Sequence, residues 1–343
     1  MDLGIDLGTS QVVIYEAGKG IVLKEPSVIA VDSRRGRMIA CGREAYDMLG
    51  RTPDSILAVR PLEKGVIADY DYAEQMIRHY VRQVCAYKIL KPRAAVSLPA
   101  SVTEVEQRSV VEAVSAAGVR RVILIEEAVA AAIGAGLDVS AARGSMAVNI
   151  GGGTTDVAIL SLKGIATSSS LRVGGNDMDA AIVRYIRGAY NLIIGVLTAE
   201  QIKKRIGGAM PREGNPTEEV RGRDALTGLP ATRTVCADEI REALGEPLEE
   251  MLSGVQRVLE NTPPEMAGDV LEHGMALTGG GALLYGLDAF IEKRTGVSCR
   301  VADNPEECVA VGTGKALKFA KLLSAGVYDV DQFSYHLSDT LTN

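Results

Sequence analysis

Near its start the chain alternates apolar strands with turns of small polar residues, and the same pattern returns in its middle. The first copy, residues 3–21, reads LGIDLGTSQVVIYEAGKGI, and the second, residues 147–165, reads AVNIGGGTTDVAILSLKGI. Each copy predicts a strand, a glycine-rich turn, a second strand and a Lys-Gly turn. Because no third copy follows at the same period, the pattern predicts a duplicated domain rather than a solenoid.

Helical periods and apolar runs alternate along the rest of the chain, which is typical of an α/β protein. The predicted elements are a helix from the capping box Thr103–Glu106 to Gly118, a strand at 119–125, a helix at 126–136 and a helical stretch at 238–261 with a break at Pro247. The polar segment 211–233, rich in Gly and Pro, predicts a loop and a hairpin.

The small residues in the two repeated turns suit phosphate binding. Without Cβ atoms, successive backbone N–H groups can approach a phosphate together, and Thr and Ser hydroxyls add donors. A single Gly-Thr-Ser turn is more often an ordinary hairpin turn. Two matching copies on comparable hairpins favour a pair of turns that hold a nucleotide's phosphates from both sides.

Two further glycine clusters precede predicted helices. A strand at Met275–Leu277 leads into three glycines and a helix predicted from Ala282, an arrangement suited to the polar edge of a ligand. Gly174 and Gly175 precede another helix, with Asn176 or Asp177 as the predicted N-cap. Neither cluster matches the Walker A loop or the Rossmann fingerprint.

Composition narrows the class of protein. The 343 residues are 47% hydrophobic and 24% charged, as in globular proteins, and the net charge of -7 argues against nucleic-acid binding. Five cysteines without a CxxC pair indicate reduced thiols, and three scattered histidines disfavour a histidine metal site or a Ser-His-Asp hydrolase. No apolar run approaches the roughly 18 residues of a membrane span, and no signal peptide is evident. We therefore expect a cytoplasmic protein.

Nine stretches, taken together and in order, resemble the MreB/Mbl family of bacterial actins over essentially the whole chain. They are GIDLGT, GKGIVLKEPSVIAVD, GRTPDSILAVRPLEKGVIADYD, LIEEAVAAAIGAG, IGGGTTDVAILSL, RVGGNDMDAAI, TGLP, LTGGGALLYGLD and AVGTGKAL. As a set they distinguish this family from the chaperone ATPases and sugar kinases of the same superfamily.

The resemblance implies an actin-like α/β fold with two lobes, each containing a duplicated ribonuclease-H-like core, and ATP with Mg²⁺ in the cleft between them. The implied first lobe covers 1–140, with an inserted subdomain at roughly 32–90. The second lobe covers 141–320, with an inserted subdomain at roughly 178–250. A C-terminal tail, 321–343, has no assigned role.

The resemblance also implies a nucleotide site. Its residues are Gly8, Thr9, Ser10 and Gln11 in the first phosphate turn, Gly151, Gly152, Gly153, Thr154 and Thr155 in the second, Gly174, Gly175 and Asp177 beside them, Glu200, Gln201, Ile202 and Lys203 at the ribose and base, and Gly280, Gly281, Ala282 and Leu283 at the adenosine. Glu200 and Lys203, at i and i+3, share one helix face. Without the family, a surface ion pair would be the commoner interpretation of those two.

Three residues are assigned to the chemistry by resemblance. Asp6 would hold Mg²⁺ through water, since this cation prefers oxygen ligands. Glu127 would position the attacking water, and Thr155 is grouped with them. Phosphoryl transfer needs mainly alignment and charge neutralisation, so one metal and one orienting carboxylate suffice.

Three positions depart from the family pattern. Asn149 stands where the family has Asp, which removes a negative charge beside the metal. Ala128 replaces a proline after the Glu pair, and Gln11 replaces an asparagine. We expect Mg²⁺ affinity or hydrolysis to be weakened at Asn149, as in a divergent paralogue; a tolerated substitution without such an effect is the alternative.

Family resemblance alone implies self-assembly into filaments, location at the inner membrane face and partners among the membrane proteins of cell elongation. An N-terminal amphipathic anchor is not expected, because the chain begins in a strand. The candidate anchor is Ile89 and Leu90, flanked by Lys88 and Lys91. Each buried apolar side chain contributes about 1.5–3 kcal/mol, and a polymer multiplies the contact. A helix end packed on the core is the alternative.

Other members of the superfamily fit less well. A heat-shock-type ATPase would carry a substrate-binding domain downstream, where only a short tail follows. A sugar kinase would need a catalytic base and a sugar pocket, and neither motif is evident. A plasmid-segregating actin remains an alternative that the nine stretches disfavour, and whether ATP is hydrolysed stays open.

Overall fold

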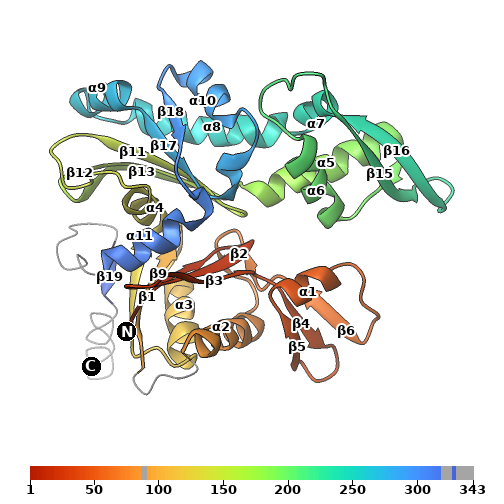
Figure 1. The fold of residues 1–343 in the computed structure, drawn as a ribbon, viewed down its shortest axis with the longest axis horizontal. Coiled ribbons are helices and arrows are strands. Elements are labelled where there is room, and N and C mark those ends of the chain that lie inside the picture. The colour runs from red at the N-terminus through yellow and green to blue at the C-terminus, as the bar shows by residue number, and fades with distance from the viewer. Residues whose placement is uncertain (86–90, 318–326, 330–343) are drawn as a thin grey trace, which may run out of the picture.

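The computed structural model describes residues 1–85, 91–317 and 327–329. Two large mixed sheets form its framework, one above the other in Figure 1, with α4 (Glu127–Gly134) and α11 (Cys308–Ala316) between them. The two helices approach so closely that a Cβ atom on Gly312 would lie 1.7 Å from the carbonyl oxygen of Ala130. Only glycine fits at this position. Small residues thus bring the two sheets together around one helical layer.

The first sheet has six strands in the order β19-β10-β9-β1-β2-β3 among the described residues. Strand β2 runs antiparallel to both of its neighbours, β1 and β3, while β1, β9 and β10 run parallel. Strand β19 adds an antiparallel edge to β10. The bounds are β1 Asp2–Leu7, β2 Gln11–Glu16, β3 Gly20–Pro26, β9 Arg93–Leu98, β10 Arg121–Glu126 and β19 Val327–Asp329.

The second sheet repeats this topology in the order β13-β12-β11-β17-β18. Strands β11, β12 and β13 are antiparallel neighbours, and β11, β17 and β18 are parallel. The duplication predicted from the two hairpins is therefore confirmed in the pairing of the strands. The bounds are β11 Ser145–Ile150, β12 Thr155–Ser161, β13 Gly164–Leu171, β17 Met275–Thr278 and β18 Cys299–Val301.

Helices cover the outer faces of both sheets (Figure 1). Helices α2 (Tyr70–Cys85) and α3 (Glu104–Ala116) bury their apolar faces against the first sheet, in a core that includes Leu3, Ile5 and Val96. The second sheet is covered by α8 (Gly245–Glu260), α9 (Pro264–His273) and α10 (Leu287–Thr295). Each sheet thus has a helical layer on either side, as in α/β domains.

Two small subdomains project on the same side of the molecule and face each other (Figure 1). The first contains α1 and the sheet β5-β4-β6, and the second contains α5, α6, α7 and the sheet β14-β15-β16. Their bounds, with the short hairpin β7–β8, are β4 Ile29–Asp32, β5 Met38–Cys41, α1 Arg43–Met48, β6 Ile56–Val59, β7 Leu62–Glu63, β8 Val66–Ile67, α5 Gly175–Tyr190, β14 Leu192–Ile193, α6 Val196–Ile206, β15 Thr217–Asp224, β16 Pro230–Cys236 and α7 Ala237–Ala243.

Several local predictions are confirmed and three need correction. The Thr103–Glu106 capping box is present, and β15 and β16 form the hairpin predicted within 211–233. The helix predicted from Ala282 is wrong, because Gly280–Leu283 forms a single 3₁₀ turn and α10 begins at Leu287. Gly286, with φ 69°, separates the two.

The other two corrections concern helix starts. The break predicted at Pro247 lies at Leu244, between α7 and α8, and Pro247 occupies the first turn of α8, where its missing N–H group is tolerated. Neither Asn176 nor Asp177 is the N-cap of α5. Gly174 takes that place, and its N–H donates to Asp177 Oδ2 at 2.9 Å.

Candidate functional site

The two glycine-rich turns lie against each other between the lobes. The first follows β1 and the second follows β11. A Cβ atom on Gly152 would lie 2.0 Å from Ser10 Oγ, and one on Gly153 would lie 2.5 Å from Thr9 Oγ1. Both distances are shorter than van der Waals contact, so glycine is required where the turns meet.

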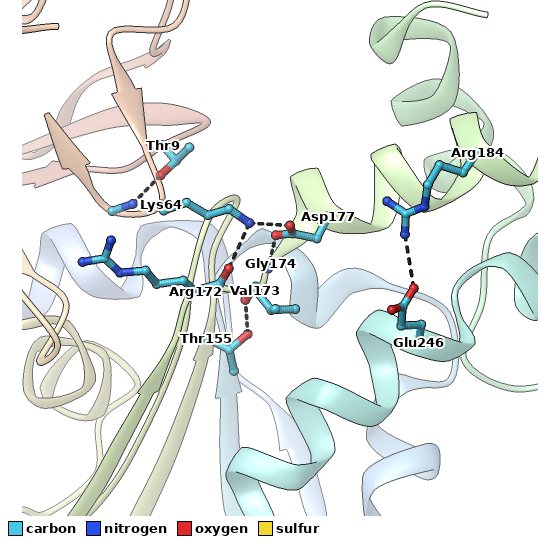
Figure 2. Close-up of polar contacts among 10 residues, drawn as sticks. Thr9, Lys64, Thr155, Arg172, Val173, Gly174, Asp177, Arg184 and Glu246 are labelled. Atoms are coloured by element: carbon cyan, nitrogen blue, oxygen red, sulfur yellow. Dashed lines mark hydrogen bonds and ion pairs between the residues drawn. The ribbon is translucent and has the colours of Figure 1, made fainter. Parts of the chain in front are cut away.

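A third turn, Lys64–Gly65 between β7 and β8, closes over this meeting point. The N–H of Gly65 donates to Thr9 Oγ1 at 2.9 Å, and the ammonium of Lys64 donates to the carbonyl oxygen of Arg172 at 2.9 Å. Lys64 also forms an ion pair with Asp177 at the start of α5 (Figure 2). The first lobe is therefore fastened to the second beside the phosphate turns.

A cavity of about 650 Å³ opens between the turns, within the roughly 300–1,000 Å³ typical of small-molecule sites. Thr9 and Thr154 both line it, so the two hairpins share one site. The sequence-predicted residues along its wall are Asp6, Gly8, Thr9, Ser10, Gln11, Glu127, Asn149, Gly151, Gly152, Gly153, Thr154, Gly175, Glu200, Lys203, Gly280, Gly281 and Leu283.

Six predicted residues lie outside the cavity wall. Thr155, the first residue of β12, follows Thr154 of the turn, and its buried hydroxyl donates to the carbonyl oxygen of Val173 at 2.8 Å (Figure 2). Five other predicted residues also lie outside the cavity wall. They are Gly174 and Asp177 at the start of α5, Gln201 and Ile202 on α6, and Ala282 in the 3₁₀ turn.

Three carboxyl groups are buried at the phosphate end of the site: Asp6, Glu127 and Asp156. Burial raises the pKa of each, and for Glu127 the charges of Asp156 and Asp6 add to the rise. Asp156 is 1% exposed, and its carboxylate oxygens make no hydrogen bond within the usual distance and angle limits, although Ser170, Thr154 and Glu127 lie close enough to lower its pKa against the effect of burial. Sequence reasoning did not single out Asp156, which directly follows the Thr154–Thr155 pair.

These groups fit a magnesium nucleotide. Buried negative charges are stabilised by a cation, and Mg²⁺ usually takes one or two carboxylates, several waters and the phosphates of its substrate. Within the described residues no group of three His, Cys, Asp or Glu side chains has the geometry of a complete metal site.

Asn149 contacts one of the three acids directly. It is 2% exposed on β11, and its Nδ2 donates to Glu127 Oε2 at 3.2 Å. Its Oδ1 accepts from Thr278 Oγ1 at 3.1 Å. The amide therefore bridges the neighbouring strand β17 and the first residue of α4.

The other end of the cavity is formed by α6 and the first small subdomain. Glu200 accepts from the hydroxyl of Tyr46 at 2.6 Å and pairs with Lys204 at 2.6 Å. Burial alone would raise the pKa of Glu200, but the Lys204 ammonium and the Tyr46 hydroxyl outweigh it and hold that pKa below its usual value. Lys203 pairs with the buried Asp179 at 2.8 Å.

Comparison with known proteins agrees with this architecture. The model of the MreB/Mbl protein family matches residues 1–325. The chain belongs to the MreB/Mbl family. It is 50% identical to the cell shape-determining protein MreB of Escherichia coli K12, over 92% of this chain and 93% of that protein. It is 46% identical to the cell shape-determining protein Mbl of Bacillus cereus, over 92% of this chain and 96% of the relative.

Solved structures give the same assignment for the fold. MreB5 of Spiroplasma citri bound to ADP superposes with a TM-score of 0.89 at 37% identity, covering 93% of this chain and 97% of that one. A MamK double helical filament superposes with a TM-score of 0.79 at 19% identity, covering 92% and 98%. The predicted actin-like fold is confirmed.

The three residues that depart from the MreB/Mbl sequence pattern, Gln11, Ala128 and Asn149, all lie in or beside the cavity wall. Gln11 and Asn149 line the cavity, while Ala128 is buried directly behind Glu127. Helix α4 still begins at Glu127 without the proline. The carboxylate therefore keeps its place at the cavity wall.

Three cavity residues of this MreB/Mbl chain, Arg43, Tyr46 and Arg212, lie outside the nine stretches that carry the resemblance. Tyr46 lies beneath Arg43 and Arg60, whose Cζ atoms are 5.1 and 5.9 Å from its ring centroid. Arg212 lies 4.6 Å from the ring centroid of Tyr285. Only the fold brings these three residues to the site.

Two further predictions concern the membrane. Ile89 and Leu90 lie outside the described residues, so the proposed anchor is not tested. Among the residues that the structure describes, no helix combines the length and apolar character of a membrane span.

Proposed function

We propose that this protein binds ATP with Mg²⁺ in the interlobe cavity and polymerises into membrane-associated filaments that direct cell-wall synthesis and cell shape. The observation that supports it most strongly is the contact of the two glycine-rich turns at one cavity, with Gly152 against Ser10 and Gly153 against Thr9. The family relatives named as cell shape-determining proteins support the cellular role.

The phosphates would lie between the two turns. Backbone N–H groups of the glycines and the hydroxyls of Thr9, Ser10 and Thr154 would donate to phosphate oxygens. The ribose and base would lie toward Glu200 and Lys203, beside the turn at Gly280. When bound, Mg²⁺ supplies positive charge that neutralises the phosphates, and Asp6 would hold it through water.

Hydrolysis is proposed to depend on Glu127. Its carboxylate lies at the cavity wall, at the N-terminus of α4, within the cluster of buried acids. A carboxylate in this position can orient a water molecule and accept its proton as the water attacks the terminal phosphate. The proposed activity is therefore ATP hydrolysis coupled to filament assembly.

Asn149→Asp is expected to raise the affinity for Mg²⁺ in the presence of ATP by about tenfold. A fourth carboxylate would increase the negative charge that faces the cation. In metal-free protein the same charge is uncompensated, so the melting temperature should fall in chelator and recover with Mg²⁺ and ATP. Calorimetric titration and thermal melts measure both. Equal Mg²⁺ affinity in the two proteins would contradict a weakened metal position.

Electron microscopy of the purified protein tests filament formation. We expect filaments with ATP or a non-hydrolysable analogue, and their recruitment to lipid vesicles. Head-to-tail contact between identical subunits does not close on itself, so it produces filaments. The double variant Ile89→Ser, Leu90→Ser should form filaments but lose most of its vesicle binding. Unchanged co-sedimentation of that variant with vesicles would refute the anchor, and absence of filaments with every nucleotide would refute the assembly.

The proposed location is the cytoplasmic face of the inner membrane, with membrane proteins of cell elongation as partners. The acidic net charge of -7 gives no support to nucleic-acid binding.

A further inference from the structure

Thr278 ends β17, directly beside Asn149 on the parallel strand β11. It is completely buried, and its hydroxyl donates to Asn149 Oδ1 at 3.1 Å, the shorter of its two contacts; the other is with the carbonyl oxygen of Val148 at 3.4 Å. A Cβ atom on Gly279 would lie 2.9 Å from the same Oδ1, so the peptide backbone also packs against the amide. The amide of Asn149 is therefore confined on the side that faces β17.

The hydrogen bonds determine which way the amide faces. Asn149 Nδ2 lies 3.2 Å from Glu127 Oε2 and donates to it, the orientation that suits the ionised carboxylate, whose oxygens only accept. The carbonyl Oδ1 then faces Thr278, whose hydroxyl can donate to it. A flipped amide would place two acceptors against each other at Glu127. Thr278, Asn149 and Glu127 thus form one directed chain of hydrogen bonds.

We infer that Thr278 is a positioning residue that acts through Asn149 to fix the carboxylate of Glu127 toward the attacking water. The inference rests on the proposed ATP hydrolysis. It gives Asn149 a role that an aspartate could not take over in the same way, since an ionised aspartate has no donor for Glu127. Thr278 orients the amide of Asn149, and that amide in turn orients the carboxylate of Glu127.

Thr278→Val tests the inference, because valine keeps the shape of threonine and removes the donor. We expect kcat for ATP to fall by about ten- to a hundredfold, as for a misplaced catalytic group, while KM changes by about twofold at most. Thr278→Ser, which retains the hydroxyl, should restore most of the activity. Thr278→Ala gives the same test if the valine variant does not fold.

Thr313→Val is the matched control. Thr313 is also completely buried, and its hydroxyl donates to the carbonyl oxygen of Val309 within α11. Val309 lines the cavity, but Thr313 itself lies outside its wall and touches none of the three acids by a hydrogen bond. We expect this variant to retain the turnover of the wild type. A loss of turnover equal to that of Thr278→Val would mean that any buried threonine has this effect, and would overturn the inference.

A second measurement does not depend on turnover. In protein labelled with ¹⁵N-asparagine and free of nucleotide, the side-chain amide of Asn149 should exchange slowly in the wild type and in Thr278→Ser, and much faster in Thr278→Val. If the wild type does not hydrolyse ATP, the proposed function fails while this measurement still decides the contact. The positioning role would be overturned if Thr278→Val left the exchange of the Asn149 amide unaltered, or if it left kcat unaltered. It would also be overturned if the variant lost kcat and ATP affinity to the same extent.

Discussion

Gly153→Ala is expected to weaken ATP binding by about ten- to a hundredfold. A Cβ atom here would lie 2.5 Å from Thr9 Oγ1 and 3.0 Å from the N and Cα atoms of Lys64. The Thr9 hydroxyl can rotate away, but the backbone of Lys64 moves only if the Lys64–Gly65 turn moves. The added methyl group therefore separates the lobes where both would contact the phosphates.

Titration with a fluorescent ATP analogue measures this effect, and Gly188→Ala is the matched control. Gly188 is exposed on α5, and a Cβ atom there would meet nothing within 4 Å. Its replacement should leave ATP affinity unchanged and add up to about 1 kcal/mol to the free energy of unfolding. Wild-type affinity in Gly153→Ala would show that the two turns do not grip the phosphates together.

The duplicated framework was predictable from sequence because it depends on local patterns. Each hairpin is encoded by short apolar runs and by glycines at the turn between them, and both signals lie within about 20 residues. The two copies, 3–21 and 147–165, form equivalent strands of two sheets with the same pairing. In the two-lobed fold the turns of the two copies meet, with Gly152 against Ser10 and Gly153 against Thr9.

The remainder of the site depends on contacts between distant segments. Tyr46 reaches Glu200 only because the two small subdomains face each other, and the hydrogen bond joins residues 154 positions apart. Thr155 lies outside the cavity wall for a different reason. The motif groups it with Thr154 of the turn, but Thr155 begins β12 and its hydroxyl is bound to the carbonyl oxygen of Val173, so only Thr154 lines the cavity.

The role of Asn149 could be predicted from sequence only in part. Comparison with the family pattern indicates a missing negative charge at this position, and that inference needs one residue only. The two hydrogen bonds of Asn149, to Glu127 and Thr278, connect three segments that no motif relates. In the proposed mechanism, the same residue would affect Mg²⁺ through its missing charge and Glu127 through its hydrogen bond.

Glu127→Gln is expected to lower the rate of ATP hydrolysis by about a hundred- to a thousandfold while leaving ATP affinity nearly unchanged. The amide keeps the size of the side chain and can still accept from Asn149, but it cannot take a proton from water. Phosphate release under single-turnover conditions measures the rate, and titration with the same fluorescent analogue measures binding. Hydrolysis at the wild-type rate would remove Glu127 from the mechanism.

Stability separates this chemical role from a structural one. Glu127 is buried beside Asp156 and Asp6, and burial together with these charges raises its pKa. Removing one of the three acids relieves repulsion, so the nucleotide-free variant should melt at or above the wild-type temperature. Glu126→Gln is the matched control, since its side chain makes no capping hydrogen bond and lies outside the cavity wall. A variant that is slower yet at least as stable has lost a catalytic group, because lost packing would lower the melting temperature as well.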